Sequence, residues 1–196
     1  MAKGKCIGYL GKRCVNQRKR GGLGFRNPKG FNQALLAKQA WRVLTNPSSL
    51  CARVLKARYF KDETILSATC PSNSSFTYRS ILHDRDLLRE GLVWHVGDGS
   101  KINIHHDNWI PRYGYLRPLG QLYVQGTTKV ADLLNNNGTS WDFCKLANMF
   151  SESDVRDIAQ IAVGGPGTED YLAWNFSKNG VFTVKSSYHL WMSRRR

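Results

Sequence analysis

The sequence predicts an α+β fold that is mainly helical. Apolar residues recur at helical spacing over most of residues 31–90 and again in short segments after residue 130. Two other segments, 92–106 and 171–184, alternate apolar and polar residues around turns that contain glycine. These patterns predict a basic helical hairpin, followed by short helices and two β-hairpins. At 196 residues, the chain has the length of one domain or of two small ones.

The predicted helical hairpin covers residues 31–60. Its first helix spans residues 31–44, and Asn46-Pro47 interrupts the pattern. We expect Asn46 to cap the second helix with Pro47 in its first turn. The apolar stripe of that second helix is expected to consist of Leu50, Cys51, Val54, Leu55 and Tyr59, with Arg53 and Lys56 on the opposite side.

The remaining elements follow from local signals. A third helix is expected at 78–90, and the turn of the first hairpin is Gly97-Asp98-Gly99-Ser100. Asn179-Gly180 marks the turn of the second hairpin. Short helices are expected at 130–134, at 141–149 after a cap at Ser140, after a cap at Ser151, and at 185–191.

Composition suggests three regions. Residues 1–30 form a basic, glycine-rich arm, residues 31–90 a helical region, and residues 91–196 a mixed region of hairpins and helices. The last predicted helix stops after about two turns, so we interpret this third region as truncated at its C-terminus.

Positive charge is concentrated in the first third of the chain. Residues 1–61 contain fifteen Lys or Arg and no Asp or Glu, whereas residues 62–196 contain fourteen of each sign. The net charge of +15 therefore comes entirely from the first segment. Such segregation favours contact with an RNA or DNA backbone, while a basic surface that only solvates the fold is the alternative. The candidate contacts are Arg18, Lys19, Arg20, Arg26, Arg42, Arg53, Lys56 and Lys61.

Other functional classes find little support. No apolar run is long enough for a membrane span or a signal peptide, so we expect an intracellular protein, nuclear or cytoplasmic, with an organelle left open by the basic start. The five cysteines include no C-x-x-C pair, and the glycines at 21–24 lack the spacing of a dinucleotide site. No Asp-Asp pair suggests a two-metal centre. We therefore expect neither a cofactor or metal site nor catalytic residues.

Several ordered motifs carry a resemblance to a known family. They are Gly21-Gly22-Leu23-Gly24-Phe25-Arg26, the segments 31–42 and 50–59, Trp94-His95-Val96-Gly97-Asp98-Gly99, Asp107-Asn108-Trp109-Ile110-Pro111 and the segment 180–188. Together they resemble plant non-LTR (LINE-type) retrotransposon reverse transcriptases, in the region downstream of the polymerase domain and upstream of the zinc-binding and RNase H part. The chain departs from that pattern at His105, where the family usually has Trp.

The resemblance implies an accessory fragment, similar to a thumb or connection, of an RNA-directed DNA polymerase. Such a fragment would bind the RNA or DNA backbone without catalysis, because the polymerase and RNase H carboxylates would lie outside it. Other parts of a reverse transcriptase are further expected partners. The alternative is a degenerate, non-enzymatic remnant that acts, if at all, as a structural or interaction module.

Overall fold

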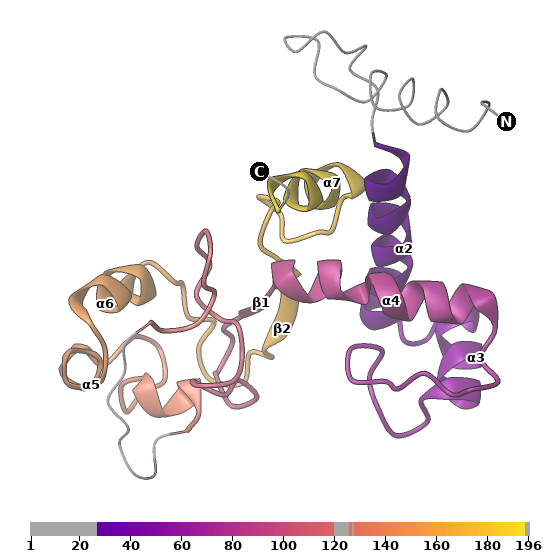
Figure 1. Cartoon of the computed structure of the whole chain (residues 1–196). Helices are drawn as coiled ribbons and strands as arrows, with labels where there is room; N and C mark the ends of the chain where they lie inside the picture. Colours follow the sequence, from indigo (N-terminus) through magenta and orange to yellow (C-terminus); the bar gives the residue numbers. More distant parts are fainter. Residues whose placement is uncertain (1–26, 120–125, 127, 195–196) are drawn as a thin grey trace, which may run out of the picture. The chain divides into compact units, whose positions relative to one another are not determined.

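The computed structural model describes residues 27–119, 126 and 128–194 (Figure 1). These residues form helices and one antiparallel sheet of two short strands, so the predicted mainly helical α+β class is confirmed. Contacts divide the chain into two compact units. Unit 1 contains the described residues up to Glu90 together with 183–194, and unit 2 contains residues 91–182. The structure thus groups residues 183–194 with the helical part, whereas the sequence-based division assigned them to the last region.

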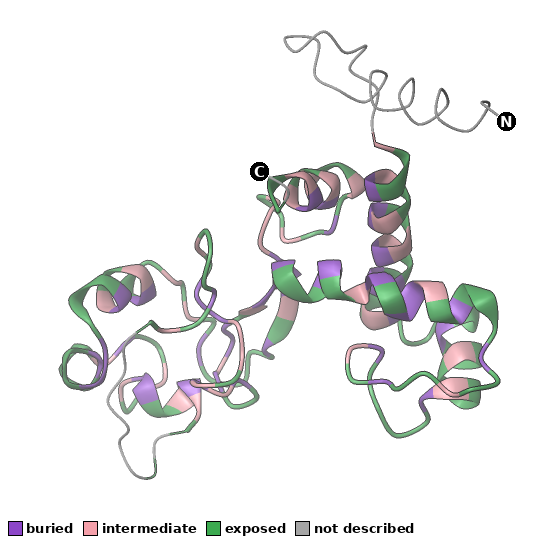
Figure 2. Ribbon diagram, in the orientation of Figure 1, coloured by how far each residue is buried: buried purple, intermediate pink, exposed green. Residues whose placement is uncertain are grey.

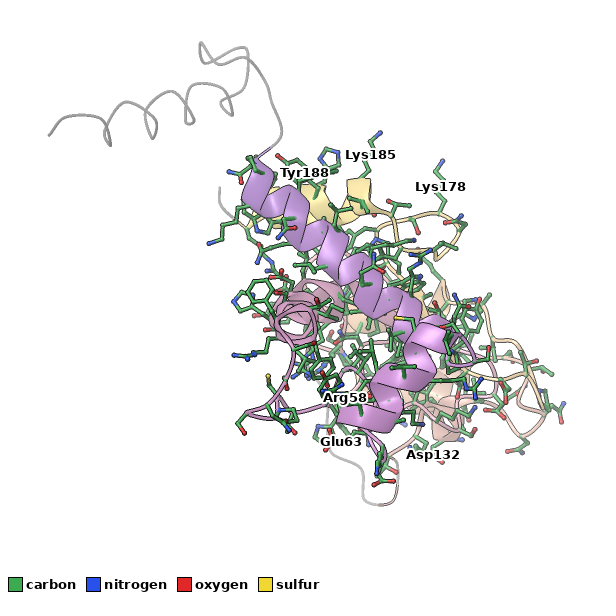
Figure 3. All side chains as sticks on the ribbon, turned by 90° about the vertical axis from the view of Figure 1, so that its right-hand side faces the viewer. Arg58, Glu63, Asp132, Lys178, Lys185 and Tyr188 are labelled. Carbon is green, nitrogen blue, oxygen red and sulfur yellow. The ribbon has the colours of Figure 1, made fainter. Side chains whose placement is uncertain are left out.

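In unit 1, helix α2 (Pro28–Thr45) packs against helix α7 (Val184–Ser193). The side chain of Asn27 caps α2 by accepting from the N–H groups of Lys29 and Gly30. Small residues let the two helices approach closely, since a Cβ on Gly30 would lie 2.3 Å from Cε3 of Trp191. The hydroxyl of Tyr188 accepts from the backbone N–H of Asn27 at 2.8 Å, which fixes α7 beside the start of α2 (Figure 3).

Helix α3 (Leu50–Tyr59) completes the predicted helical hairpin but differs from it in two details. Ser49, not Asn46, is its N-cap, because the backbone N–H of Asn46 instead bonds the carbonyl of Arg42 and ends α2. The predicted apolar stripe is wrong in part, since Leu55 and Tyr59 are half-buried but its other members are exposed. Ala52 is the buried residue of this helix, while Leu50 and Val54 are 73% and 55% exposed. Periodicity finds a helix but does not say which face a neighbour covers.

Helix α4 (Phe76–Gly91) confirms the helix predicted at 78–90. Its buried apolar side chains are Tyr78, Ile81, Leu82, Leu87 and Leu88. The ring of Tyr78 stacks on that of Tyr59 with centroids 4.0 Å apart, which connects α4 to α3. Figure 2 shows such buried positions interspersed with exposed ones along the helices of this unit.

In unit 2, the strands pair differently from the prediction. Strand β1 (Leu92–His95) pairs antiparallel with β2 (Tyr171–Trp174), with Leu92 opposite Trp174. The two expected hairpins at 92–106 and 171–184 are therefore wrong, since each contributes one strand to a shared sheet. The turn at Asn179-Gly180 does form, with the N–H of Trp174 bonded to the carbonyl of Gly180. The segment after it does not return as a strand, because Thr183 caps α7.

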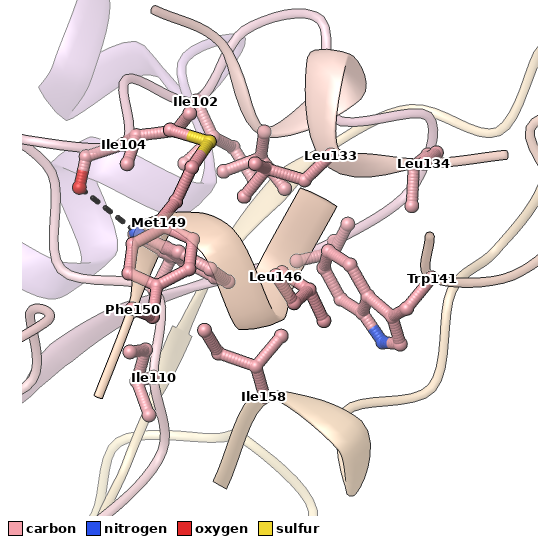
Figure 4. Close-up of a cluster of buried hydrophobic side chains, with 13 residues drawn as sticks. Ile102, Ile104, Ile110, Leu133, Leu134, Trp141, Leu146, Met149, Phe150 and Ile158 are labelled. Atoms are coloured by element: carbon pink, nitrogen blue, oxygen red, sulfur yellow. Dashed lines mark hydrogen bonds between the residues drawn. The ribbon is translucent and has the colours of Figure 1, made fainter. Parts of the chain in front are cut away.

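The core of unit 2 lies beside short helices (Figure 4). These are the 3-10 helix η2 (Val130–Leu133), α5 (Phe143–Met149) and α6 (Glu152–Ala159). Asp142 caps α5 in place of the predicted Ser140, whereas the cap at Ser151 is confirmed. The buried core residues are Val96, Ile102, Ile104, Trp109, Ile110, Val130, Leu133, Leu134, Trp141, Leu146, Met149, Phe150 and Ile158. Within this core, Nε1 of Trp109 donates to the carbonyl of Ile104 at 3.1 Å.

Candidate nucleic-acid interface

Four of the predicted contacts lie in the described part of unit 1. Arg42 is in the last turn of α2, Arg53 and Lys56 are on α3, and Lys61 follows the end of α3. All four side chains are exposed, and within the described residues none of them makes a salt bridge. Exposed cations that form no ion pair keep their charge available to an anion. The other predicted contacts, Arg18, Lys19, Arg20 and Arg26, lie outside the described residues.

Helix α3 brings two of these cations together. Arg53 and Lys56 are three residues apart, so they are neighbours on the helix surface. Arg58, which the prediction did not single out, is also exposed, and its guanidinium lies 5.4 Å from the ring centroid of Tyr59. Hydrogen bonds from Ser75 lower the pKa of Tyr59. The exposed Leu50 and Val54 share the helix with these cations. The surface of α3 is therefore mixed, apolar as well as basic.

The acids of unit 1 are mostly engaged elsewhere. Asp86 pairs with Arg89 at 2.9 Å, and Glu90 pairs with Arg194. Asp84 is 6% exposed and accepts from Nε2 of Gln33 at 2.8 Å. Only Asp62 and Glu63, next to Lys61, add exposed negative charge close to the end of α3. The local balance at α2 and α3 is thus strongly positive.

A shallow groove with a volume of about 590 Å³ lies between α2 and α4. Asn32 lines it from α2, and Arg79 and Arg85 line it from α4. Nε and Nη2 of Arg79 donate to the carbonyl of Ser74 at 3.1 and 2.9 Å. Nη1 of Arg85 donates to the carbonyls of Ile65 and Ala68. Both guanidinium groups are therefore anchored by main-chain oxygens.

Comparison with known proteins gives two relatives. The chain is 41% identical over 108 residues to the uncharacterized mitochondrial protein AtMg00310 of Arabidopsis thaliana, and the match covers 55% of this chain and 70% of that protein. The chain belongs to the family of this mitochondrial protein. It is also 34% identical over 178 residues to the "Putative ribonuclease H protein At1g65750" of the same plant. That match covers 88% of this chain but 29% of the relative, so the chain spans less than a third of that protein's length. No family model and no solved structure matches the chain.

In this member of the AtMg00310 family, two buried acids of unit 2 have structural roles. Asp170, 5% exposed, accepts from the N–H groups of Gly97 and Gly99 through Oδ1 and from that of Lys101 through Oδ2. Its carboxylate thereby holds the turn after β1. No local signal could have revealed this, since the donors lie about seventy residues away in sequence.

The second structural acid is Asp154, which is fully buried on α6. Nη1 of Arg112 donates to it at 2.8 Å and to Asp157 at 2.7 Å. Burial lowers the pKa of Arg112, but the hydrogen bonds to Asp157 and Asp154 outweigh this and raise it overall. The remaining donors of Arg112 reach the carbonyls of Tyr115 and Arg117. One guanidinium therefore ties the loop after Pro111 to α6.

Two further kinds of feature are absent from the described ranges of this family member. No group of three or more His, Cys, Asp or Glu side chains could hold a metal ion there. None of the helices in those ranges is both long and apolar enough to cross a membrane. The cysteines in those ranges, Cys51, Cys70 and Cys144, are unpaired by disulfides and exposed.

Proposed function

We propose that this chain is an accessory fragment of a retroelement reverse transcriptase, of the plant non-LTR type, that binds the RNA or DNA backbone through unit 1. The observation that carries the proposal is the exposed basic surface of α2 and α3, in which Arg42, Arg53 and Lys56 have no acidic partner among the described residues. The motif resemblance and the ribonuclease H name of one relative support the retroelement part.

The proposed role is non-catalytic. Each buried carboxylate in the described ranges already has fixed donors: Asp84 has Gln33, Asp154 has Arg112, and Asp170 has three backbone N–H groups. Hydrogen bonds of this kind give each buried carboxylate a structural role in the fold. This supports a binding role in which catalysis belongs to other parts of the parent enzyme.

A salt titration of two paired variants tests the binding proposal. The first neutralises the interface on α3 with Arg53→Gln and Lys56→Gln, and the control neutralises the exposed Arg156 and Lys178 of unit 2. Each backbone contact that is lost should reduce the slope of log K against log salt by about 0.7 to 0.9, for every sequence alike. We expect this for RNA and DNA oligonucleotides with the α3 variant and little change with the control.

The basic arm is tested in the same assay. Neutralising Arg18, Lys19 and Arg20 together should weaken binding to all sequences while the circular dichroism spectrum stays the same. If neither this variant nor the α3 variant changes affinity or salt slope, the charge only solvates the chain. The exposed Leu50 and Val54 on α3 would then favour the remnant alternative, in which α3 is an interaction surface.

A further inference from the structure

The groove between α2 and α4 contains two guanidinium groups that form no salt bridge within the described residues. They belong to Arg79 and Arg85. Their hydrogen-bond acceptors are the main-chain carbonyls of Ser74, Ile65 and Ala68. A carbonyl orients a guanidinium without cancelling its charge. The two side chains are thus held in place while remaining fully cationic.

Partial burial makes this arrangement costly without an anion. Arg85 is partly buried, and burial together with the nearby Arg89 lowers its pKa. Only one of its three nitrogens is used by the carbonyls, so the others can still donate to a ligand. The planar guanidinium of Arg suits phosphate recognition, and a guanidinium that is already held in place loses little freedom when it binds a phosphate.

The remaining lining fits an anionic ligand as well. Asn32 and Ser80 supply neutral polar groups from the two helices. Asp84 is the acid of the lining, and its Oδ1 already accepts from Gln33 and lies 2.8 Å from Nδ1 of His83. The volume of about 590 Å³ is that of a site for a nucleotide-sized group.

We propose that this groove binds a phosphate group of a nucleic-acid strand, held between Arg79 and Arg85. The inference rests on the proposed function and assigns one phosphate contact to a defined place in unit 1. It adds a site on α4 that lies outside the strongly basic segment of the sequence.

The test places a carboxylate in the groove without removing either arginine. Asn32→Asp is nearly isosteric and adds one negative charge to the lining. Gln39→Glu is the matched control, because Gln39 is exposed on the same helix and does not line the groove. The full chain is titrated with a ten-residue oligothymidylate, with and without a 5′-phosphate, and with inorganic pyrophosphate.

We expect Asn32→Asp to weaken oligonucleotide binding about three- to tenfold more than Gln39→Glu at low salt. An equal loss for both oligonucleotides assigns the groove to an internal phosphate, and a loss confined to the phosphorylated one assigns it to a strand end. Equal effects of the two variants on every probe overturn the proposal, and so does a loss confined to pyrophosphate, which would mark a site for a free anion.

Failure of the proposed function is distinguishable from failure of this inference. If the α3 and arm variants leave binding unchanged but Asn32→Asp weakens it, the result supports a phosphate site in the groove and contradicts nucleic-acid contacts at α3 and the arm. If those variants weaken binding while Asn32→Asp and Gln39→Glu have equal effects, the result supports the contacts at α3 and the arm and contradicts a phosphate site in the groove.

Discussion

Units 1 and 2 use charged residues in opposite ways. Unit 2, residues 91–182, contains seven Lys or Arg and nine Asp or Glu. The rest of the chain contains twenty-two Lys or Arg and five Asp or Glu. In unit 2 the acids that hold the fold together are buried, since Asp154 is fully buried and Asp170 is 5% exposed. In the described part of unit 1, the cations of α2 and α3 are mostly at the surface, and the two helices bury mainly alanine, glycine and tryptophan.

This difference shows that the net charge of a region and the charges that stabilise its fold are separate properties. The charges that hold unit 2 together nearly cancel and leave no excess for a polyanion. In the described part of unit 1, Arg42, Arg53 and Lys56 are exposed and make no salt bridge, so their charge remains available to an anion. Replacing the buried charges of unit 2 should accordingly change stability, and replacing the exposed cations of unit 1 should change affinity.

The largest expected effect comes from breaking the buried ion pair of unit 2. Arg112→Ala leaves Asp154 buried without its cation, which should lower the free energy of unfolding by about 3 to 5 kcal/mol. Urea denaturation measures this, and hydrogen exchange should place the loss in residues 91–182. Arg156→Ala, an exposed position on the same helix as Asp154, is the control and should cost little. A loss equal to that of the control would show that the pair does not stabilise unit 2.

The second-largest loss of stability is expected at the turn after β1. Asp170→Ala removes the acceptor of three backbone N–H groups and should lower the free energy of unfolding by about 2 to 3 kcal/mol. Glu169→Ala next to it is the control, because Glu169 is exposed and lies 3.6 Å from Lys101 in a surface pair. Nucleic-acid affinity should stay unchanged in both. A drop in affinity would instead place unit 2 in the interface.

A packing variant tests what holds unit 1. Gly30→Ala inserts a methyl group into the contact between α2 and Trp191, which should cost about 1 to 3 kcal/mol despite the better helix propensity of alanine. The loss should show in thermal unfolding and in faster hydrogen exchange of α7. Gln39→Ala on the exposed side of α2 should leave both unchanged. If Gly30→Ala stabilises the protein, the close contact does not exist in solution.

The smallest expected effect is a pH dependence. Hydrogen bonds from Ser100, by its side chain and its N–H, lower the pKa of Asp98. A lowered pKa stabilises the fold above the unfolded value near 3.9, and this contribution is lost as pH falls through the folded value. We expect less than about 1 kcal/mol, measured by urea denaturation between pH 5 and pH 2.5. Asp98→Asn should reduce the acid-induced loss, and an unchanged profile would contradict the assignment.

The predictable part of this structure is the part that local sequence determines. Helix α2, helix α4 and the cap at Ser151 follow from periodicity and capping residues close by in the chain. The exposure of Arg53 and Lys56 could also be predicted, because both lie on the polar side of a helix. Their role as nucleic-acid contacts stays a prediction.

The rest depends on partners that are distant in sequence. Each predicted hairpin had its own turn signal, yet β1 pairs with β2, and Asp170 binds the turn from the neighbouring strand. The groove shows the same limitation, since Asn32 and Arg79 share it only because α2 and α4 meet. Patterns within a short window cannot contain such information.

The contact between α2 and α7 also has a consequence for biosynthesis. A ribosome makes α2 first and reaches Trp191 only after all of residues 91–182 have been added. The surface at Gly30 therefore stays open to water, or to a chaperone, until Trp191 has been added. Residues 91–182 can close their own sheet earlier, because β2 precedes α7. The contact between α2 and α7 is thus the last of these contacts to form during synthesis.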